Sequence, residues 1–459
     1  MSDRRLNRMF FLAYTFPPVS TGSGPRCVAF SRCMPEGGWT LIPVVSRNPV
    51  GLPLDESLLD SLPPDVLESR IVLRDPLGKF AMPQDPMYEP GGDRSTQRLN
   101  RLLKLLRSLF RLYVLIPDKA MIWSMEASKA IVRAAPESGA RMIMSFGPPH
   151  SCHIAAMKAS RRTGLPWVAH FGDLWTYDSL NEWQYVSSFS RMIQRRLEAR
   201  VVTGADGILT TSASSSEYFE RTYGRRCPPT HFLPNGYDPQ ILSPAPEPDR
   251  NPGERFTITY TGFFMGTQTP EHFFEGLRLY FSRRPSSRLR VRIVGDLRPL
   301  HRNMPERLGI ADRLEITGQV SFARAREEQM AADALMVMYP PLPGSEVKNP
   351  TKLAEYLLAR RSILAIVAEG ELSRTIEALE AGYSVPQDPE LISEVLARME
   401  DDWSEGRLRI VSDMDAVARM FDMRQGCRSL GLFLDQIASR GRLRWAALSS
   451  RHARGKGWR

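Results

Sequence analysis

Short apolar runs alternate along the chain with longer segments of helical periodicity. In the N-terminal half these runs are Met9–Ala13, Trp39–Val45, Arg141–Ser145 and Pro166–Ala169, and a further strand that ends in hydroxyls is expected at Ala205–Ser212. Unbroken apolar runs of this length are typical of parallel strands that are buried on both faces. The segments between them, such as Pro25–Arg32 and Cys152–Thr163, have the length and composition of helices. The alternation therefore predicts strand–helix–strand units.

The same alternation returns after residue 255. Strands are expected at Phe256–Thr261, Leu289–Val294, Ile316–Gly318, Ala334–Tyr339 and Ile363–Val367. Residues 388–438 are expected to be helical, and residues 239–254 have the proline-rich, charged composition of a linker. We expect an α/β protein with two Rossmann-like domains, residues 1–238 and 255–425, whose parallel sheets face a cleft. A C-terminal helix and basic tail, residues 426–459, should follow.

Two basic segments stand outside this pattern. Residues 47–95 show little periodicity and predict an irregular insertion that extends to about residue 120. Within it, residues 97–116 are expected to form a basic amphipathic helix without an acidic residue. Residues 440–459 carry seven Arg and Lys and no acidic residue. Both segments suit an anionic membrane surface. The alternatives are a helix packed on its own domain and a solvated tail.

Charge and composition narrow the function further. The chain has 61 Lys and Arg against 51 Asp and Glu, a net charge of +10, which favours acidic partners. No nucleic-acid recognition motif accompanies that charge, so we expect no nucleic acid partner. The five cysteines are scattered without a CxxC or Cys/His cluster, which predicts a reduced, cytoplasmic protein without a zinc site. No apolar stretch is long enough to span a bilayer.

The stretch Gly344–Ile363 carries the clearest chemistry. A loop leads to Pro350, which suits a helix start, and a helix over residues 350–361 is expected. Thr351 and Lys352 then lie where free backbone N–H groups favour an anion such as a phosphate. Glu355, about one turn further on, can accept hydrogen bonds from hydroxyls. The stretch is either a seat for a phosphorylated sugar or nucleotide or an ordinary capped helix.

Candidate residues in the N-terminal half follow strand ends. Gly22 and Gly24 allow close approach of the backbone to a ligand, although their spacing lacks the third glycine of a dinucleotide fingerprint. His150 and His170 lie just past expected strands, as does Asp173. Ligands bind at this edge of open α/β sheets. His170, with Asp173 beside it, is the stronger candidate for proton transfer or sugar binding, and a structural role is the alternative for each histidine.

Three segments together resemble glycosyltransferase family 4, the retaining nucleotide-sugar enzymes of GT-B fold, and within it the bacterial surface-polysaccharide branch. They are Tyr14–Gly24 with Arg26 behind it, Ser145–His150 with Leu165–Trp175, and Pro350–Leu358, supported by Leu233–Asp238 and Tyr260–Gly262. The resemblance implies a donor that is a UDP- or GDP-sugar and an acceptor that is a glycan or a polyprenyl-linked sugar. It also implies a cytoplasmic enzyme, peripheral on the inner face of the plasma membrane, that transfers a hexose or N-acetylhexosamine without a metal or other cofactor.

The resemblance also assigns roles to residues. Glu355 resembles the second glutamate of the family's paired-glutamate motif, which binds the nucleotide ribose, and the backbone at Thr351 and Lys352 resembles the seat of the diphosphate. His170, Asp173 and Lys352 are the implied catalytic residues. The remaining donor-binding residues implied are Gly22, Gly24, Asn235, Gly262 and Gly266. Because the departing phosphate is thought to assist the acceptor hydroxyl, no protein nucleophile is nominated.

The sequence departs from the family pattern at two positions, and these departures leave other functions possible. The first glutamate of the pair would fall at residue 347, which is Val, with Glu346 adjacent. The basic residue usual after the second glycine loop is missing between Gly262 and Pro270, which leaves Lys348, Lys352 and Arg298 to supply the charge. The alternatives are a sugar-nucleotide epimerase or phosphorylase of the same architecture and a catalytically decayed binding or scaffold protein.

Overall fold

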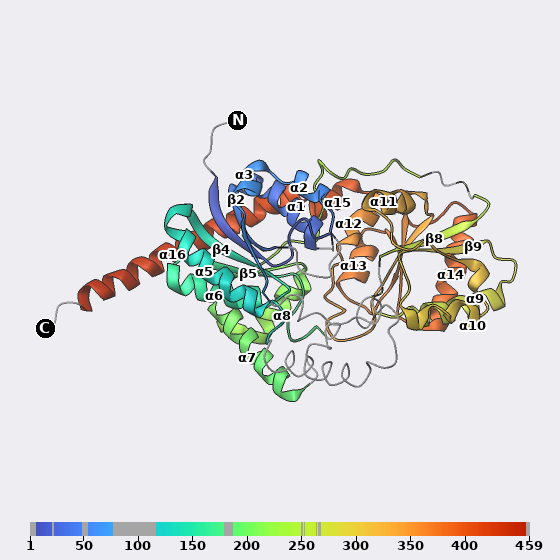
Figure 1. The fold of residues 1–459 in the computed structure, drawn as a ribbon. Coiled ribbons are helices and arrows are strands. Elements are labelled where there is room, and N and C mark those ends of the chain that lie inside the picture. The colour runs from blue at the N-terminus through green and yellow to red at the C-terminus, as the bar shows by residue number, and fades with distance from the viewer. Residues whose placement is uncertain are drawn as a thin grey trace, which may run out of the picture.

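The computed structural model describes residues 6–20, 23–47, 54–76, 116–178, 187–248, 251, 253–262, 264 and 268–455. Its strands form two sheets in which every pairing is parallel, and helices cover both faces of each sheet (Figure 1). The α/β fold with two parallel sheets is therefore confirmed. One sheet is built from residues 7–232 and the other from residues 256–385.

The first sheet has seven strands in the order β3-β2-β1-β4-β5-β6-β7. They are β1 (Asn7–Ala13), β2 (Trp39–Ser46), β3 (Ile71–Leu73), β4 (Ala140–Gly147), β5 (Trp167–Phe171), β6 (Gly207–Thr210) and β7 (Thr230–Phe232). Successive residues of β1 point to opposite faces, so Met9 and Phe11 enter one apolar core and Phe10 and Leu12 enter the other. Burial on both faces explains why the strands are continuous apolar runs.

The helices of this half are divided between the two faces. They are α1 (Ser23–Cys33), α2 (Ser57–Asp60), α3 (Pro64–Glu68), α5 (Met121–Ser138), α6 (Ser151–Thr163), α7 (Ser188–Gly204) and α8 (Ala213–Tyr223). Side chains of α1 belong to the core on one face, and those of α5 to α8 belong to the core on the other. The described part of the expected insertion 47–120 is not wholly irregular, because it contains α2, α3 and the edge strand β3.

The second sheet has six strands in the order β10-β9-β8-β11-β12-β13. They are β8 (Phe256–Thr261), β9 (Leu289–Val294), β10 (Leu314–Ile316), β11 (Ala334–Met338), β12 (Ser362–Ile366) and β13 (Gly382–Val385). Its helices are α9 (Glu271–Arg283), α10 (Met304–Arg307), α11 (Phe322–Ala331), α12 (Lys352–Leu358), α13 (Glu371–Ala378), α14 (Pro389–Ser404) and α15 (Met414–Phe421). The helix expected over 350–361 is shorter, since Arg360 adopts a positive φ of 51° that ends it.

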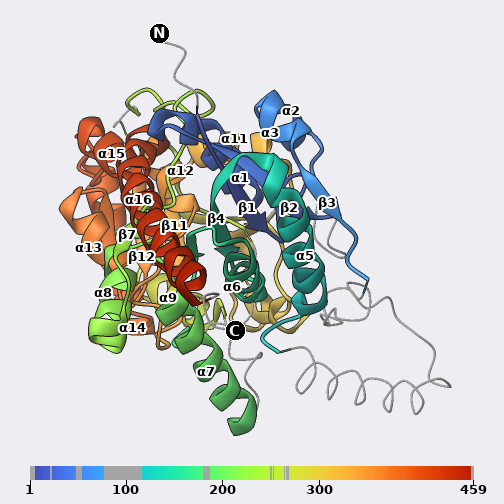
Figure 2. The same ribbon diagram turned by 90° about the vertical axis from the view of Figure 1, so that its left-hand side faces the viewer.

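The last helix returns to the first sheet. Helix α16 (Met423–Gly455) follows α15 and runs back beside α1, so that both chain ends lie on the N-terminal half (Figures 1 and 2). Cys427, Leu430 and Leu434 of α16 are fully buried in the same core as Phe11 and Phe30. At the crossing a Cβ on Gly431 would lie 2.1 Å from the carbonyl oxygen of Gly37, so the two backbones touch.

Candidate functional site

Two glycines at the carboxyl edge of the second sheet form the base of the site. Gly262 follows β8 with φ of 127°, and Gly295 follows β9 with φ of 151°. A Cβ on Gly295 would lie 2.0 Å from the carbonyl oxygen of Gly262, so a side chain there is excluded. A Cβ on Gly262 would lie 3.0 Å from Nζ of Lys352. The glycines therefore keep the backbone bare directly beside a lysine.

Lys352, the first residue of α12, is held against the end of β8. Its Nζ donates a 2.7 Å hydrogen bond to the carbonyl oxygen of Thr261 and lies 4.4 Å from the ring centroid of Tyr260. Burial lowers the pKa of Lys352 to about 8, although the nearby Glu355 carboxylate raises it. The ammonium group is thus desolvated and fixed in place, and a phosphate beside it would stabilise its charge.

Glu355 lies one turn after Lys352 on α12. Its Oε2 accepts a 3.2 Å hydrogen bond from Nε2 of Gln329 on α11, and its backbone carbonyl accepts one of 2.6 Å from Arg326. Burial raises the pKa of Glu355, and its contact with Gln329 and the charges of Arg326 and Lys352 partly oppose that rise. The carboxylate is therefore oriented by an amide, in a geometry that suits acceptance of hydrogen bonds from hydroxyls. Thr351 precedes this turn and its side chain is exposed.

A cluster around Arg26 occupies the carboxyl edge of the first sheet. Arg26 of α1 donates from Nη1 to Oδ1 of Asn235, and its Nη2 lies 2.9 Å from Nε2 of His170. His170 is stacked on Phe146, with ring centroids 4.5 Å apart and planes 6° apart. Asn235 in turn donates from Nδ2 to the carbonyl oxygen of Asn349, in the loop that precedes α12. The cluster therefore joins the two halves of the protein.

Lys348 makes a second connection between the halves. Its Nζ lies 2.5 Å from Oδ2 of Asp178 and also bonds Oδ1 of Asp173. Burial alone lowers the pKa of Lys348, but the two carboxylates outweigh burial and raise it above the ordinary value. Asp173 is thus paired with Lys348 and His170 with Arg26, so these two of the three expected catalytic residues have separate partners.

The loop Gly344–Asn349 is packed against the N-terminal half. Val347, where the family's first glutamate was expected, is buried in the core formed by the helices α5 to α8. A Cβ on Gly344 would lie 2.8 Å from Cα of Asp178. The neighbouring Glu346 carboxylate is used within the protein. Its Oε2 accepts a 2.8 Å hydrogen bond from the N–H of Gly344, and the carboxylate also accepts a hydrogen bond from Tyr177.

The structure places the expected residues in two groups. Gly262, Lys352 and Glu355 lie together on the second sheet, and Asn235 and His170 lie together on the first. Gly24 is packed against the backbone, since a Cβ there would lie 1.6 Å from the carbonyl oxygen of Val19. Gly22 and Gly266 lie outside the described residues, as does almost all of segment 97–116. His170 belongs to β5 rather than to the loop after it, because the strand extends to Phe171.

Two participants, Gln329 and Asp178, were not predicted from the sequence. Gln329 has no motif around it, and Asp178 is 170 positions away in the chain from its partner Lys348. Arg26 stood in the resembling segment, and the signal that could have singled it out is a lone arginine within an otherwise apolar stretch of α1. Such long-range pairings depend on how the two sheets face each other, which the local pattern does not encode.

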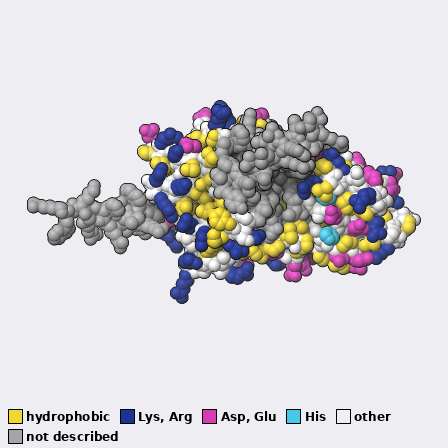
Figure 3. Space-filling view, turned by 60° about the horizontal axis from the view of Figure 1, so that its bottom comes forward, with side chains coloured by type: hydrophobic (Ala, Val, Ile, Leu, Met, Phe, Trp, Pro, Cys, Tyr) yellow, Lys and Arg dark blue, Asp and Glu magenta, His cyan; other side chains and the backbone are white. Residues whose placement is uncertain are grey.

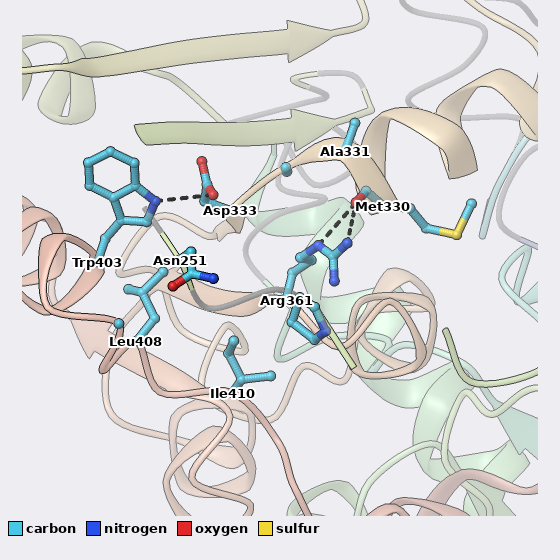
Figure 4. A pocket seen from close by; sticks show the side chains of 11 residues that line it. Asn251, Met330, Ala331, Asp333, Arg361, Trp403, Leu408 and Ile410 are labelled. Atoms are coloured by element: carbon cyan, nitrogen blue, oxygen red, sulfur yellow. Dashed lines mark hydrogen bonds between the residues drawn. The ribbon is translucent and has the colours of Figure 1, made fainter. Parts of the chain in front are cut away.

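A pocket of about 220 Å³ lies at the opposite edge of the second sheet (Figure 4). Asp333 and Arg361, which line it, directly precede β11 and β12. Asp333 accepts a 3.2 Å hydrogen bond from Nε1 of Trp403, and Arg361 donates from Nε and Nη2 to the carbonyl oxygen of Met330. These polar groups are thus bonded within the protein, and the pocket is separate from Gly262, Lys352 and Glu355.

Helix α7 presents a basic face on the N-terminal half. Helix α7 exposes Arg191, Arg195, Arg196 and Arg200, while its one acidic residue, Glu198, is buried. Phe189 and Met192 on the same helix are exposed by 52% and 40%. In Figure 3 the acidic side chains gather mainly over the half formed by the second sheet.

Two other kinds of site are not found among the described residues. No group of three His, Cys, Asp or Glu residues within the described ranges could hold a metal ion. In the same part of the chain no helix has both the length and the apolarity needed to cross a membrane.

Comparison with known families places this geometry in context. Residues 75–236 match the family described as Glycosyl transferase 4-like domain. A search of curated proteins finds no match. The resemblance to glycosyltransferase family 4 is thus confirmed for a segment that includes His170, Asp173 and Asn235.

Solved structures share the fold of this protein over most of its chain. Sucrose-phosphate synthase from Thermosynechococcus elongatus is similar over 94% of this chain and 99% of its own, with a TM-score of 0.62 and 16% identity. Anabaena HepE in complex with UDP and glucose is similar over 94% and 100%, with a TM-score of 0.57 and 14% identity. WaaG, a glycosyltransferase involved in lipopolysaccharide biosynthesis, is similar over 92% and 98%, with a TM-score of 0.53 and 14% identity. The chain has the GT-B fold of glycosyltransferases.

Proposed function

We propose that the protein is a retaining glycosyltransferase that moves a hexose or N-acetylhexosamine from a UDP- or GDP-sugar to a hydroxyl of a glycan or polyprenyl-linked acceptor. The observation that carries this proposal is the pairing of Lys352 and Glu355 on one turn of α12, beside the bare backbone of Gly262. The complexes of HepE with UDP and with UDP-glucose support a nucleotide-sugar donor for a protein of this fold.

The site residues would act on the two ends of the donor. Glu355, held by Gln329, would accept hydrogen bonds from the ribose hydroxyls. Lys352 would lie against the diphosphate, where negative charge grows as the bond between the anomeric carbon and the phosphate oxygen breaks. A fixed cation in a partly desolvated site stabilises that charge more strongly than one in water. In the retaining reaction the departing phosphate would take the proton of the acceptor hydroxyl, so no protein nucleophile or metal is invoked.

An anionic membrane surface is part of the proposal. Residues 97–116, apart from Ile116, lie outside the described residues. Residues 440–455 of the expected basic tail are part of helix α16 rather than a segment that follows it. The exposed face of α7 supports the same partner, because four arginines with no exposed acid flank Phe189 and Met192. A membrane there would present a polyprenyl-linked acceptor, and the enzyme would work from the cytoplasmic face in synthesis of a surface polysaccharide.

The direct test is binding of nucleotide sugars by the full chain. Thermal shift and calorimetry with UDP, GDP and their hexose and N-acetylhexosamine conjugates should reveal one preferred nucleotide. Lys352→Ala and Glu355→Ala should each weaken that binding about tenfold or more, the scale of one charged hydrogen bond. Glu377→Ala, an exposed glutamate on α13, serves as the matched control and should bind like the wild type.

The same experiment separates the competing functions. A catalytically decayed scaffold is favoured by one observation, the burial of Val347 where a glutamate was expected, and it predicts no response to any nucleotide. An epimerase would bind the nucleotide sugar but change the sugar without an acceptor. Product analysis with and without a polyprenyl-linked glycan therefore distinguishes transfer from epimerisation, and unchanged turnover in Lys352→Ala would remove the site assignment.

A further inference from the structure

Arg26 is a buried cation whose direct partners are neutral. Its exposed fraction is 7%, and its guanidinium bonds the Asn235 side chain, the His170 ring and, at 3.3 Å, the carbonyl oxygen of Leu233. Among the described residues no carboxylate lies within ion-pair distance of it. Burying an arginine without a carboxylate is costly, because neutral acceptors repay only part of the lost hydration.

Two buried hydrogen-bond donors in the cluster around Arg26 have no acceptor among the residues that the structure describes. A guanidinium has only donors, so the 2.9 Å contact requires Nε2 of His170 to accept, and the ring proton must then sit on Nδ1. Burial and the charge of Arg26 lower the pKa of His170, which agrees with a neutral ring. Within the described part of the chain, neither Nδ1–H of His170 nor Nε–H of Arg26 has a hydrogen-bond partner. Positive charge together with unused donors is the pattern of an anion site.

A second arginine on the same helix shows the contrast. Arg32 also reaches the segment after β7, but it meets Oδ2 of Asp238 at 2.6 Å and the Gln240 side chain at 2.8 Å. Its charge is therefore matched within the protein. The acidic side chain whose charge acts on Arg26 is Asp173, and Asp173 is already paired with Lys348.

Hydrogen bonds through Asn235 connect Arg26 to the loop that precedes the proposed donor site. Asn235, which accepts from Arg26, donates to the carbonyl of Asn349, three residues before Lys352. Separation of the two halves at this contact would release the guanidinium toward the cleft. We propose that Arg26 binds a phosphate group of a substrate, and so supplies from the first sheet a cation that the segment Gly262–Pro270 lacks. This inference rests on the proposed function, and the phosphate belongs either to the donor diphosphate or to a prenyl-phosphate acceptor.

The test compares Arg26→Gln with wild type in the full chain, using two ligands. In the donor arm, calorimetry measures the preferred nucleoside diphosphate and its monophosphate. Arg26→Gln should lower the diphosphate affinity about ten- to a hundredfold with a smaller effect on the monophosphate. In the acceptor arm, binding of undecaprenyl phosphate in detergent micelles should fall by the same factor if the phosphate is the acceptor's. Unchanged affinity in both arms overturns the inference.

Controls separate binding from folding and from the proposed function. Arg32→Gln breaks an ion pair on the same helix and should lower the melting temperature without changing either affinity. Arg26→Lys keeps the charge but loses the Nε donor, so it should recover part of the lost affinity even where Arg26→Gln folds poorly. If wild type binds no nucleotide, the proposed donor function fails, and the acceptor arm alone then decides whether Arg26 binds phosphate.

Discussion

Ser212 donates a 2.8 Å hydrogen bond from Oγ to the carbonyl oxygen of Val347. Ser212 also caps helix α8, because the same oxygen accepts from the N–H of Ser215. A residue that begins a helix of the first sheet therefore fixes the loop that leads to α12 of the second. Residue 347 is thus a point of contact between the halves, and its side chain faces an apolar core rather than a sugar.

Restoring the family's glutamate should not restore a family-like site. Val347→Glu would place a carboxylate in the core that contains Trp175 and Phe171, at a cost of about 3 kcal/mol or more. Urea unfolding should show this loss, whereas Val347→Ala should lose only about 1–2 kcal/mol. A Val347→Glu protein with wild-type stability and higher turnover would contradict the assignment.

Lys348 should contribute more than Asp173 to the contact between the two halves. Lys348→Met leaves Asp178, whose side chain is 1% exposed, without its cation and should cost about 3 kcal/mol. Asp173→Asn should cost about 1 kcal/mol or less, because Asp173 is 32% exposed and Lys348 keeps its other partner. Chemical unfolding of the wild type and the two variants measures both losses in unfolding free energy. Equal losses in Lys348→Met and Asp173→Asn would contradict this prediction.

Donor binding should fall as the pH rises through about 8. The lysine that contacts phosphate must be protonated, and the pKa of Lys352 is lowered to about 8 by burial. Affinity for the nucleoside diphosphate is therefore full below that pH and declines above it, by up to about tenfold, the value of one charge-assisted hydrogen bond. Calorimetry from about pH 6.5 to about pH 9.5 brackets this pKa and measures the profile. Lys352→Arg keeps its charge over this range, so its profile should be flat.

A side chain at Gly262 should disturb the site through contact as well as strain. Gly262→Ala would adopt a φ of 127° and bring Cβ within 3.0 Å of Lys352 Nζ. We expect a loss of about 1–2 kcal/mol in stability from the backbone, together with weaker donor binding. Gly318→Ala is the matched control, because φ there is 74° but nothing lies within 4 Å of the added Cβ. It should lose stability and keep its affinity.

Burial on both faces made the central strands predictable from sequence. β1 and β2 are largely apolar, β8 alternates apolar residues with threonine, and the ends of all three differ from the expected limits by two residues or fewer. β13 was missed because its four residues include a glycine and an exposed serine. Helix α5, which contains Pro136, was not predicted, and α12 ends early because Arg360 turns the backbone into the left-handed region.

In the candidate site, contacts within one helix could be predicted from the sequence, but contacts between distant segments could not. Lys352 and Glu355 are one helical turn apart, so local spacing sufficed to bring them together. The partners of His170 and Asp173 come from α1 and from the loop before α12, and no local pattern encodes those meetings. The burial of Val347 could not be predicted either, because a single valine in a polar loop belongs to no helix or strand pattern.

The return of α16 to the first sheet has a consequence for synthesis. The core that contains Phe11 and Phe30 lacks Cys427, Leu430 and Leu434 until the ribosome has made nearly the whole chain. One face of the first sheet therefore stays incomplete while the second half is translated and folds. Early termination anywhere before α16 would leave an apolar face exposed on the nascent protein, a surface that chaperones bind.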